Sequence, residues 1–102
     1  MTNEELNTAL YKKMFAEQEK YRAWLLTQPP EEVLRLAYEY TVREDILLSL
    51  EYNDMTDEQA EAMLKLSKPL AAVFNDWENK ETDYMQNIWI TVEERAKKEI
   101  SK

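Results

Sequence analysis

Carboxylates are the only side chains in this 102-residue chain with the number and spacing that chemistry requires. The densest group is Asp54, Asp57, Glu58 and Glu61. Residues three and four positions apart share a helix face, so these oxygens could approach one Mg²⁺ or Ca²⁺ ion. An EF-hand loop is excluded, because the acidic spacing differs and the chain has no Gly for the sharp turn. We predict no metal site and no cofactor, and a carboxylate enzyme that uses a divalent ion remains the third alternative.

The missing residue types close most routes to catalysis. The chain has no His, the commonest general base and metal ligand, and no Cys to act as a thiolate or zinc ligand. Without Gly it has neither a P-loop nor a dinucleotide-binding turn. The hydroxyls of Thr8, Thr27, Ser49 and Ser67 have no neighbouring base in the sequence. We therefore predict that the protein is not an enzyme and has no catalytic residues.

The apolar spacing predicts a single all-α domain over residues 1–102, a small bundle of about four helices. These helices are expected over 2–28, 30–52, 56–66 and 69–98, the last being the longest. Capping boxes open the first and third, at Thr2 and Thr56, and Pro29-Pro30 separates the first two. A further capping-box pattern at 41–44 leaves open whether 30–52 is one helix or two, and we favour one.

Eleven aromatic side chains divide between the expected core and its edges. The apolar faces predict burial of Trp24, Tyr40, Phe74, Trp77 and Tyr84. Those expected at the edges are Phe15, Tyr38, Tyr52 and Trp89, of which Tyr38 and Tyr52 are the candidate anchors for a partner. The last helix could also bury Ile88, Trp89 and Val92 by homodimerisation.

Acidic residues are concentrated in one third of the chain. The net charge is -8, and residues 31–66, with ten acidic and three basic side chains, carry -7 of it. Such a surface disfavours direct nucleic-acid binding and favours a basic, nucleic-acid-binding protein as partner. The alternative is that acidity only maintains solubility. The residues of the predicted partner surface are Tyr38, Glu44, Asp45, Glu51, Tyr52, Asp54, Asp57, Glu58 and Glu61.

The location follows from two absences. No apolar run approaches the ~20 residues that a membrane-spanning helix needs. The first residues, MTNEE, are acidic and lack the basic and apolar regions of a signal peptide. We expect no membrane association and a place in the cytoplasm of a bacterial host cell.

Three strings resemble an uncharacterised family, catalogued as a domain of unknown function: LYKKMFAEQ at 10–18, WLL with PPEE within 24–32, and YEYTVREDI at 38–46. The pattern at 67–71, 81–82 and 93–96 is also similar. The family comprises small acidic proteins from mobile elements of Gram-positive gut bacteria, and it supplies no activity or site residues.

Mobile elements carry inhibitors of host defences, and this context implies an anti-CRISPR protein. Such a DNA mimic would block nucleic-acid binding by a Cas9-type nuclease, whose basic channels fit an acidic surface. The alternative is an accessory or assembly protein of the mobile element that binds its partner through apolar and aromatic surface.

Overall fold

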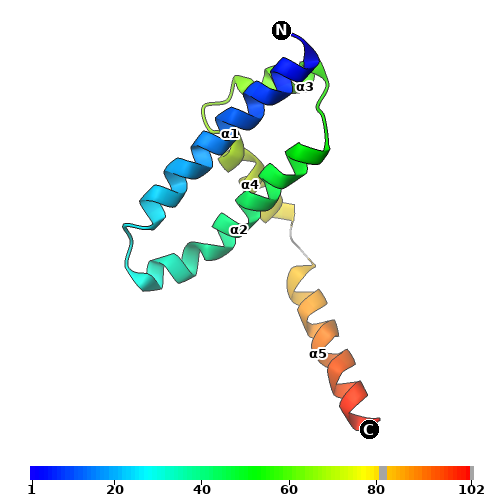
Figure 1. The fold of residues 1–102 in the computed structure, drawn as a ribbon. Coiled ribbons are helices and arrows are strands. Elements are labelled where there is room, and N and C mark those ends of the chain that lie inside the picture. Colours follow the sequence, from blue (N-terminus) through cyan, green and yellow to red (C-terminus); the bar gives the residue numbers. More distant parts are fainter. Residues whose placement is uncertain (81–82, 102) are drawn as a thin grey trace.

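The computed structural model describes residues 1–80 and 83–101, and every regular element among them is a helix. The five helices are α1 (Asn3–Leu25), α2 (Pro30–Tyr52), α3 (Asp57–Leu64), α4 (Pro69–Lys80) and α5 (Tyr84–Ile100). Figure 1 shows that α1 and α2 form a long antiparallel hairpin and that α5 points away from the other helices. The predicted all-α class is confirmed.

Local signals set the ends of the hairpin helices. Thr2 caps α1 through a capping box with Glu5, and these hydrogen bonds hold the pKa of Glu5 below its usual value. Pro30 occupies the first turn of α2, where its missing N–H costs nothing. The helix then continues to Tyr52, so the prediction of one helix over 30–52 is confirmed and the pattern at 41–44 caps no helix end.

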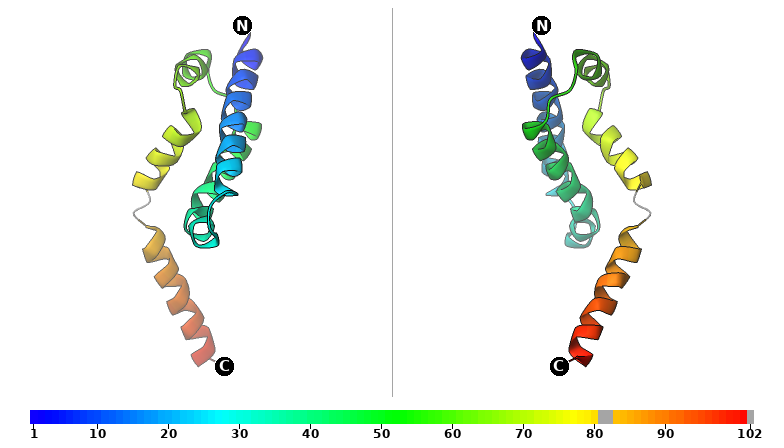
Figure 2. Two further views of the ribbon diagram at one scale, coloured as in Figure 1. Left: turned by 90° about the vertical axis from the view of Figure 1, so that its left-hand side faces the viewer. Right: turned by 90° about the vertical axis from the view of Figure 1, so that its right-hand side faces the viewer.

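The helices α3 and α4 form a second layer on one side of the hairpin (Figure 2). A capping box between Thr56 and Gln59 opens α3, as predicted. The centre of the core consists of Leu10, Met14, Leu47 and Leu70, all buried, with seven partly buried apolar side chains packed against them. These contacts unite α1–α4, residues 1–80, which we call the body.

The long C-terminal helix expected over 69–98 is supported only in part, because the described residues of this range form two shorter helices. The first ends at Lys80 and the second begins at Tyr84, while the expected positions 81 and 82 lie outside the described residues. Asp83 precedes α5, and Asp is a poor residue for a helix interior because its side chain competes for backbone hydrogen bonds. Its side chain makes no capping hydrogen bond to α5.

Three aromatic residues that were expected in the core are exposed. The exposed fractions are 49% for Trp24, 47% for Trp77 and 49% for Tyr84. Each lies near a helix end, and Trp77 and Tyr84 are covered only in part, by Tyr38 of α2. The predicted burial is confirmed for Phe74. Tyr40, which was also expected in the core, is only partly buried.

Candidate partner-binding surface at the acidic end

Two asparagines of α1 hold the segment between α2 and α3. The Asn7 amide donates to the Met55 carbonyl oxygen at 3.1 Å and accepts from the Met55 backbone N–H at 2.8 Å. The Asn3 amide donates to the same carbonyl at 2.9 Å and to the Asp57 carboxylate at 2.7 Å. These bonds join the start of α1 to the start of α3, although more than 45 residues separate them in sequence.

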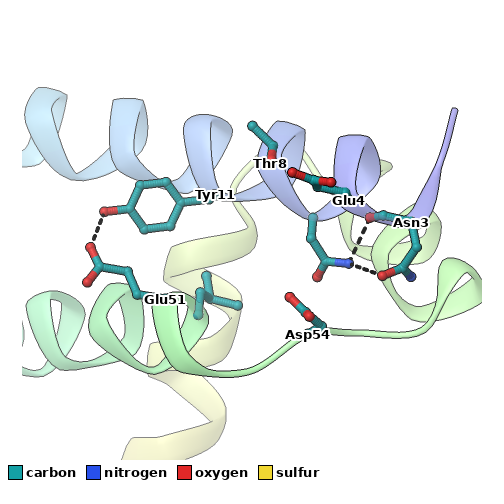
Figure 3. Close-up of a pocket in the computed structure, with 8 residues that line it drawn as sticks. Asn3, Glu4, Thr8, Tyr11, Glu51 and Asp54 are labelled. Atoms are coloured by element: carbon teal, nitrogen blue, oxygen red, sulfur yellow. Dashed lines mark hydrogen bonds between the residues drawn. The ribbon is translucent and has the colours of Figure 1, made fainter.

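Three carboxylates surround the pocket that this arrangement creates. The pocket, of about 560 Å³, lies between the start of α1 and the end of α2, and Glu4, Glu51 and Asp54 line it. Figure 3 shows the Tyr11 hydroxyl donating to Glu51, at 2.9 Å. This hydrogen bond raises the pKa of Tyr11 above its ordinary value. None of the lining residues is basic, so the pocket presents a negative surface.

Three more acidic residues lie on the neighbouring helix α3, the first residue of which is hydrogen-bonded to Asn3. Asp57 is fixed by Asn3, and Glu58 and Glu61 are exposed on the same helix. We call the set of Glu4, Glu51, Asp54, Asp57, Glu58 and Glu61 the acidic end. Five of these six residues belong to the predicted partner surface, and Tyr52, which is exposed, ends the helix beside them.

The remaining predicted site residues lie further along α2. The Glu44 carboxylate accepts from the buried Gln18 amide at 3.0 Å, and Asp45 is exposed. Tyr38 lies thirteen residues before Glu51, about 20 Å along the helix. Its hydroxyl accepts from Trp77 Nε1 at 3.2 Å, and its ring lies against Phe74 and Tyr84. The structure thus separates Tyr38 from the acidic end.

Glu4 was missed because residues 1–30 have no net charge. The signal that could have found it is the hairpin itself. Both helices have 23 residues and a short connection, so the first turn of α1 lies beside the last turn of α2. Antiparallel pairing therefore places Glu4 near Glu51.

Two charged side chains of α1 fix the orientation of α3 and α4. The Lys13 ammonium donates to the carbonyl oxygens of Leu64, at 2.8 Å, and Leu66 at the end of α3. The Glu17 carboxylate accepts from the backbone N–H groups of Leu70 and Ala71, at 2.8 and 2.9 Å. Each charge is opposite to the helix dipole end that it meets.

A charged cluster that the sequence did not predict lies inside the hairpin. The guanidinium of the buried Arg43 is 2.6 Å from Glu39 and 3.9 Å from Glu17. It also lies 4.2 Å from the ring centroid of Tyr21, the pKa of which is raised, chiefly by burial. The Tyr21 hydroxyl is buried without a hydrogen-bond partner among the described residues. Through Arg43 the cluster joins α1 to α2 and to Glu17, the residue that caps α4.

The part of the chain that the structure describes has neither a candidate metal site nor a candidate membrane-spanning helix. No three His, Cys, Asp or Glu side chains in that part of the chain lie together in a way that could hold a metal ion. None of the described helices has the length and apolar character needed to cross a bilayer.

Comparison with known proteins assigns the chain to a family. A family model described as "Protein of unknown function (DUF3848)" matches residues 6–100. No curated protein and no solved structure matches the chain.

Proposed function

The chain belongs to the DUF3848 family of unknown function, and we propose that it is a non-catalytic inhibitor whose acidic end binds a basic protein surface. The observation that carries this proposal is the convergence of Glu4, Glu51 and Asp54 on one pocket that has no basic residue in its lining. The three come from α1, α2 and the segment after α2, so the fold brings together charges that are distant in sequence.

The partner would be a protein that holds nucleic acid in a basic groove, and a Cas9-type nuclease is the first candidate. Such grooves present Lys and Arg to phosphates, and clustered carboxylates provide charge of the same sign. Opposite potentials speed encounter and orient the two proteins. Bound there, the acidic end would block the access of nucleic acid to the groove.

The hydrogen bonds of the acidic end support recognition by a preformed surface. Asn3 and Asn7 fix the backbone on which Asp54 and Asp57 lie. Glu51 is oriented by Tyr11. Side chains already held in place lose less conformational freedom when they bind.

Charge reversal with a matched control tests the proposal. The test variant carries Asp54→Lys and Glu61→Lys, and the control carries Glu19→Lys and Glu78→Lys, which change the net charge equally away from the acidic end. Each is immobilised and offered to a purified Cas9-type nuclease and to host lysate, and captured proteins are identified by mass spectrometry. We expect wild type and control to capture a nucleic-acid-binding protein that added duplex DNA displaces, and the test variant to lose it.

Salt distinguishes this function from the alternative. The Debye length falls from about 10 Å at 0.1 M salt to about 3 Å at 1 M, so binding through the acidic end weakens steeply with salt. Equal capture by the test variant and the control, resistant to salt and to DNA, would overturn the proposal.

The second candidate is an accessory or assembly protein that binds through apolar surface. The observation that favours it is α5, on which Met85, Ile88, Trp89 and Val92 are all exposed. Its signature would be a partner that is retained at high salt and lost when these side chains are changed.

A further inference from the structure

Beyond Tyr84, the ring of which contacts Tyr38, the last helix has an apolar face that the body does not cover. None of the 17 residues of α5 is buried. Its exposed residues Tyr84, Met85, Ile88 and Val92 recur at three- and four-residue steps, and a shallow pocket of about 310 Å³ lies along Ile88 and Val92. In proteins most helical stability comes from packing of an amphipathic face against another surface. A covering surface would therefore stabilise α5 as a helix.

The size of the exposed surface fits an interface. A compact protein of 12.2 kDa exposes about 6,100 Å², whereas this chain exposes 7930 Å². The radius of gyration is 18.0 Å, against about 13 Å for a compact domain of this length. The excess exceeds the roughly 800 Å² that each partner buries in a standard protein–protein interface.

The pattern of α5 is self-complementary. Around Ile88, Met85 and Thr91 lie three residues away on either side, and Tyr84 and Val92 lie four residues away. A two-fold axis at Ile88 would therefore bring Tyr84 of each copy against Val92 of the other. Isologous dimers require this kind of symmetry, in which one patch binds itself.

Charge also selects a second copy as the occupant. Residues 84–92 carry no charged side chain, whereas residues 1–80 carry sixteen acidic and nine basic ones, a net charge of -7. Two bodies in contact would therefore repel each other electrostatically. The uncharged segment 84–92 lets two copies meet without this repulsion. Figure 1 shows that α5 points away from the body. Antiparallel pairing would therefore place the two bodies at opposite ends of the paired segments.

We propose that α5 is a dimerisation helix, in which residues 84–92 pair antiparallel with the same segment of a second copy. The proposal is independent of the function proposed for the acidic end. A dimer would carry two acidic ends far apart, each free to bind its own partner.

Matched substitutions in the full-length protein test this pairing by sedimentation velocity over a concentration series. Ile88 and Ile90 are equally exposed, at 41% and 42%, but lie about 200° apart around the helix axis. We expect wild type and Ile90→Asp to reach twice the 12.2 kDa monomer mass and Ile88→Asp to remain monomeric. A monomeric wild type at every concentration would overturn the proposal, as would equal dissociation of the two variants.

The absence of Cys allows a second test that does not depend on stability. In separate variants, Ile88→Cys and Ile90→Cys, a mild oxidant removes two electrons and two protons from a pair of thiols to form a disulfide. A thiol on the two-fold axis meets its own copy, so we expect Ile88→Cys to cross-link at least ten-fold faster than Ile90→Cys. Equal rates would contradict the antiparallel register. The charge-reversal variant of the acidic end should remain dimeric.

Discussion

The body and α5 are built from similar amphipathic sequence, but only the body covers its apolar faces. In the body, Leu10 and Leu70 are fully buried, and side chains of α1 bind the ends of α3 and α4. In α5, every residue is exposed, and the Asp83 side chain makes no capping hydrogen bond. The contrast shows what an amphipathic pattern can predict. It indicates that one face of a helix is apolar, but it does not identify the surface that covers this face.

The two regions also differ in charge, and this difference divides their proposed roles. The acidic end groups carboxylates from three segments around one pocket. The segment 84–92 has no charge. Salt should therefore weaken the proposed binding at the acidic end and leave the proposed pairing through α5 nearly unchanged, because apolar burial is not screened.

The largest expected effect comes from the core of the body. Leu10→Ala removes a fully buried side chain and should lower the free energy of unfolding by about 2–5 kcal/mol. Ile90→Ala in α5 should change it by less than about 0.5 kcal/mol. Urea unfolding followed by circular dichroism measures both. Similar losses in the two variants would show that α5 is packed as tightly as the core.

A smaller effect is expected at the cap of α4. Glu17→Ala removes the carboxylate that accepts from Leu70 and Ala71, and should cost about 1–2 kcal/mol. Asp83→Ala should cost much less, because the Asp83 side chain caps nothing. Urea unfolding compares the stability of the two variants. An equal loss of unfolding free energy in both would refute the view that only the body depends on side-chain caps.

The acidic end depends on Asn7. Asn7→Ala leaves the N–H and carbonyl of Met55 without this partner and should cost about 1 kcal/mol. Because Asn3 still contacts Met55, the fold should remain, with faster amide exchange confined to residues 53–57. Exchange that accelerates equally in α5 would indicate that the two regions are coupled.

The smallest effect is on the titration of Tyr11. Its pKa is raised in the folded chain by Glu51, so its stabilising contribution is present below about pH 10 and is lost as pH rises through the folded pKa. Glu51→Gln should bring this pKa back toward that of an ordinary tyrosine. NMR titration of the Tyr11 ring in the wild type and in Glu51→Gln measures the shift. An unchanged Tyr11 pKa would exclude the bond to Glu51 in solution.

Much of the body could be predicted because its signals are local. The capping boxes at Thr2 and Thr56 and the proline at position 30 act on residues within one turn, so the sequence alone locates these helix starts. The break before α5 has no Gly or Pro to mark it. It leaves the periodicity of the apolar residues nearly unbroken, which is why one long helix was expected.

The candidate site was only partly predictable, because its tertiary contacts are distant in sequence. Asn3 and Asn7 bind the Met55 carbonyl, 52 and 48 residues away, and nothing near them in the sequence indicates that they will meet this segment. The charge run identified the acidic residues from 51 to 61. The tertiary structure is needed to show that Glu4 lines the same pocket as Glu51. It is also needed to show that Tyr38 lies apart from this pocket, beside Trp77 of α4.

Hydrogen exchange of the full-length protein, followed by mass spectrometry at low and high concentration, tests most directly whether the body is self-sufficient and α5 is not. We predict that amides of the core segments of α1 and α2 are protected at both concentrations. Those of residues 84–92 should exchange rapidly in dilute protein and become protected as the concentration rises. Protection of residues 84–92 that is already complete in dilute protein, or that never develops, would contradict this division of the molecule.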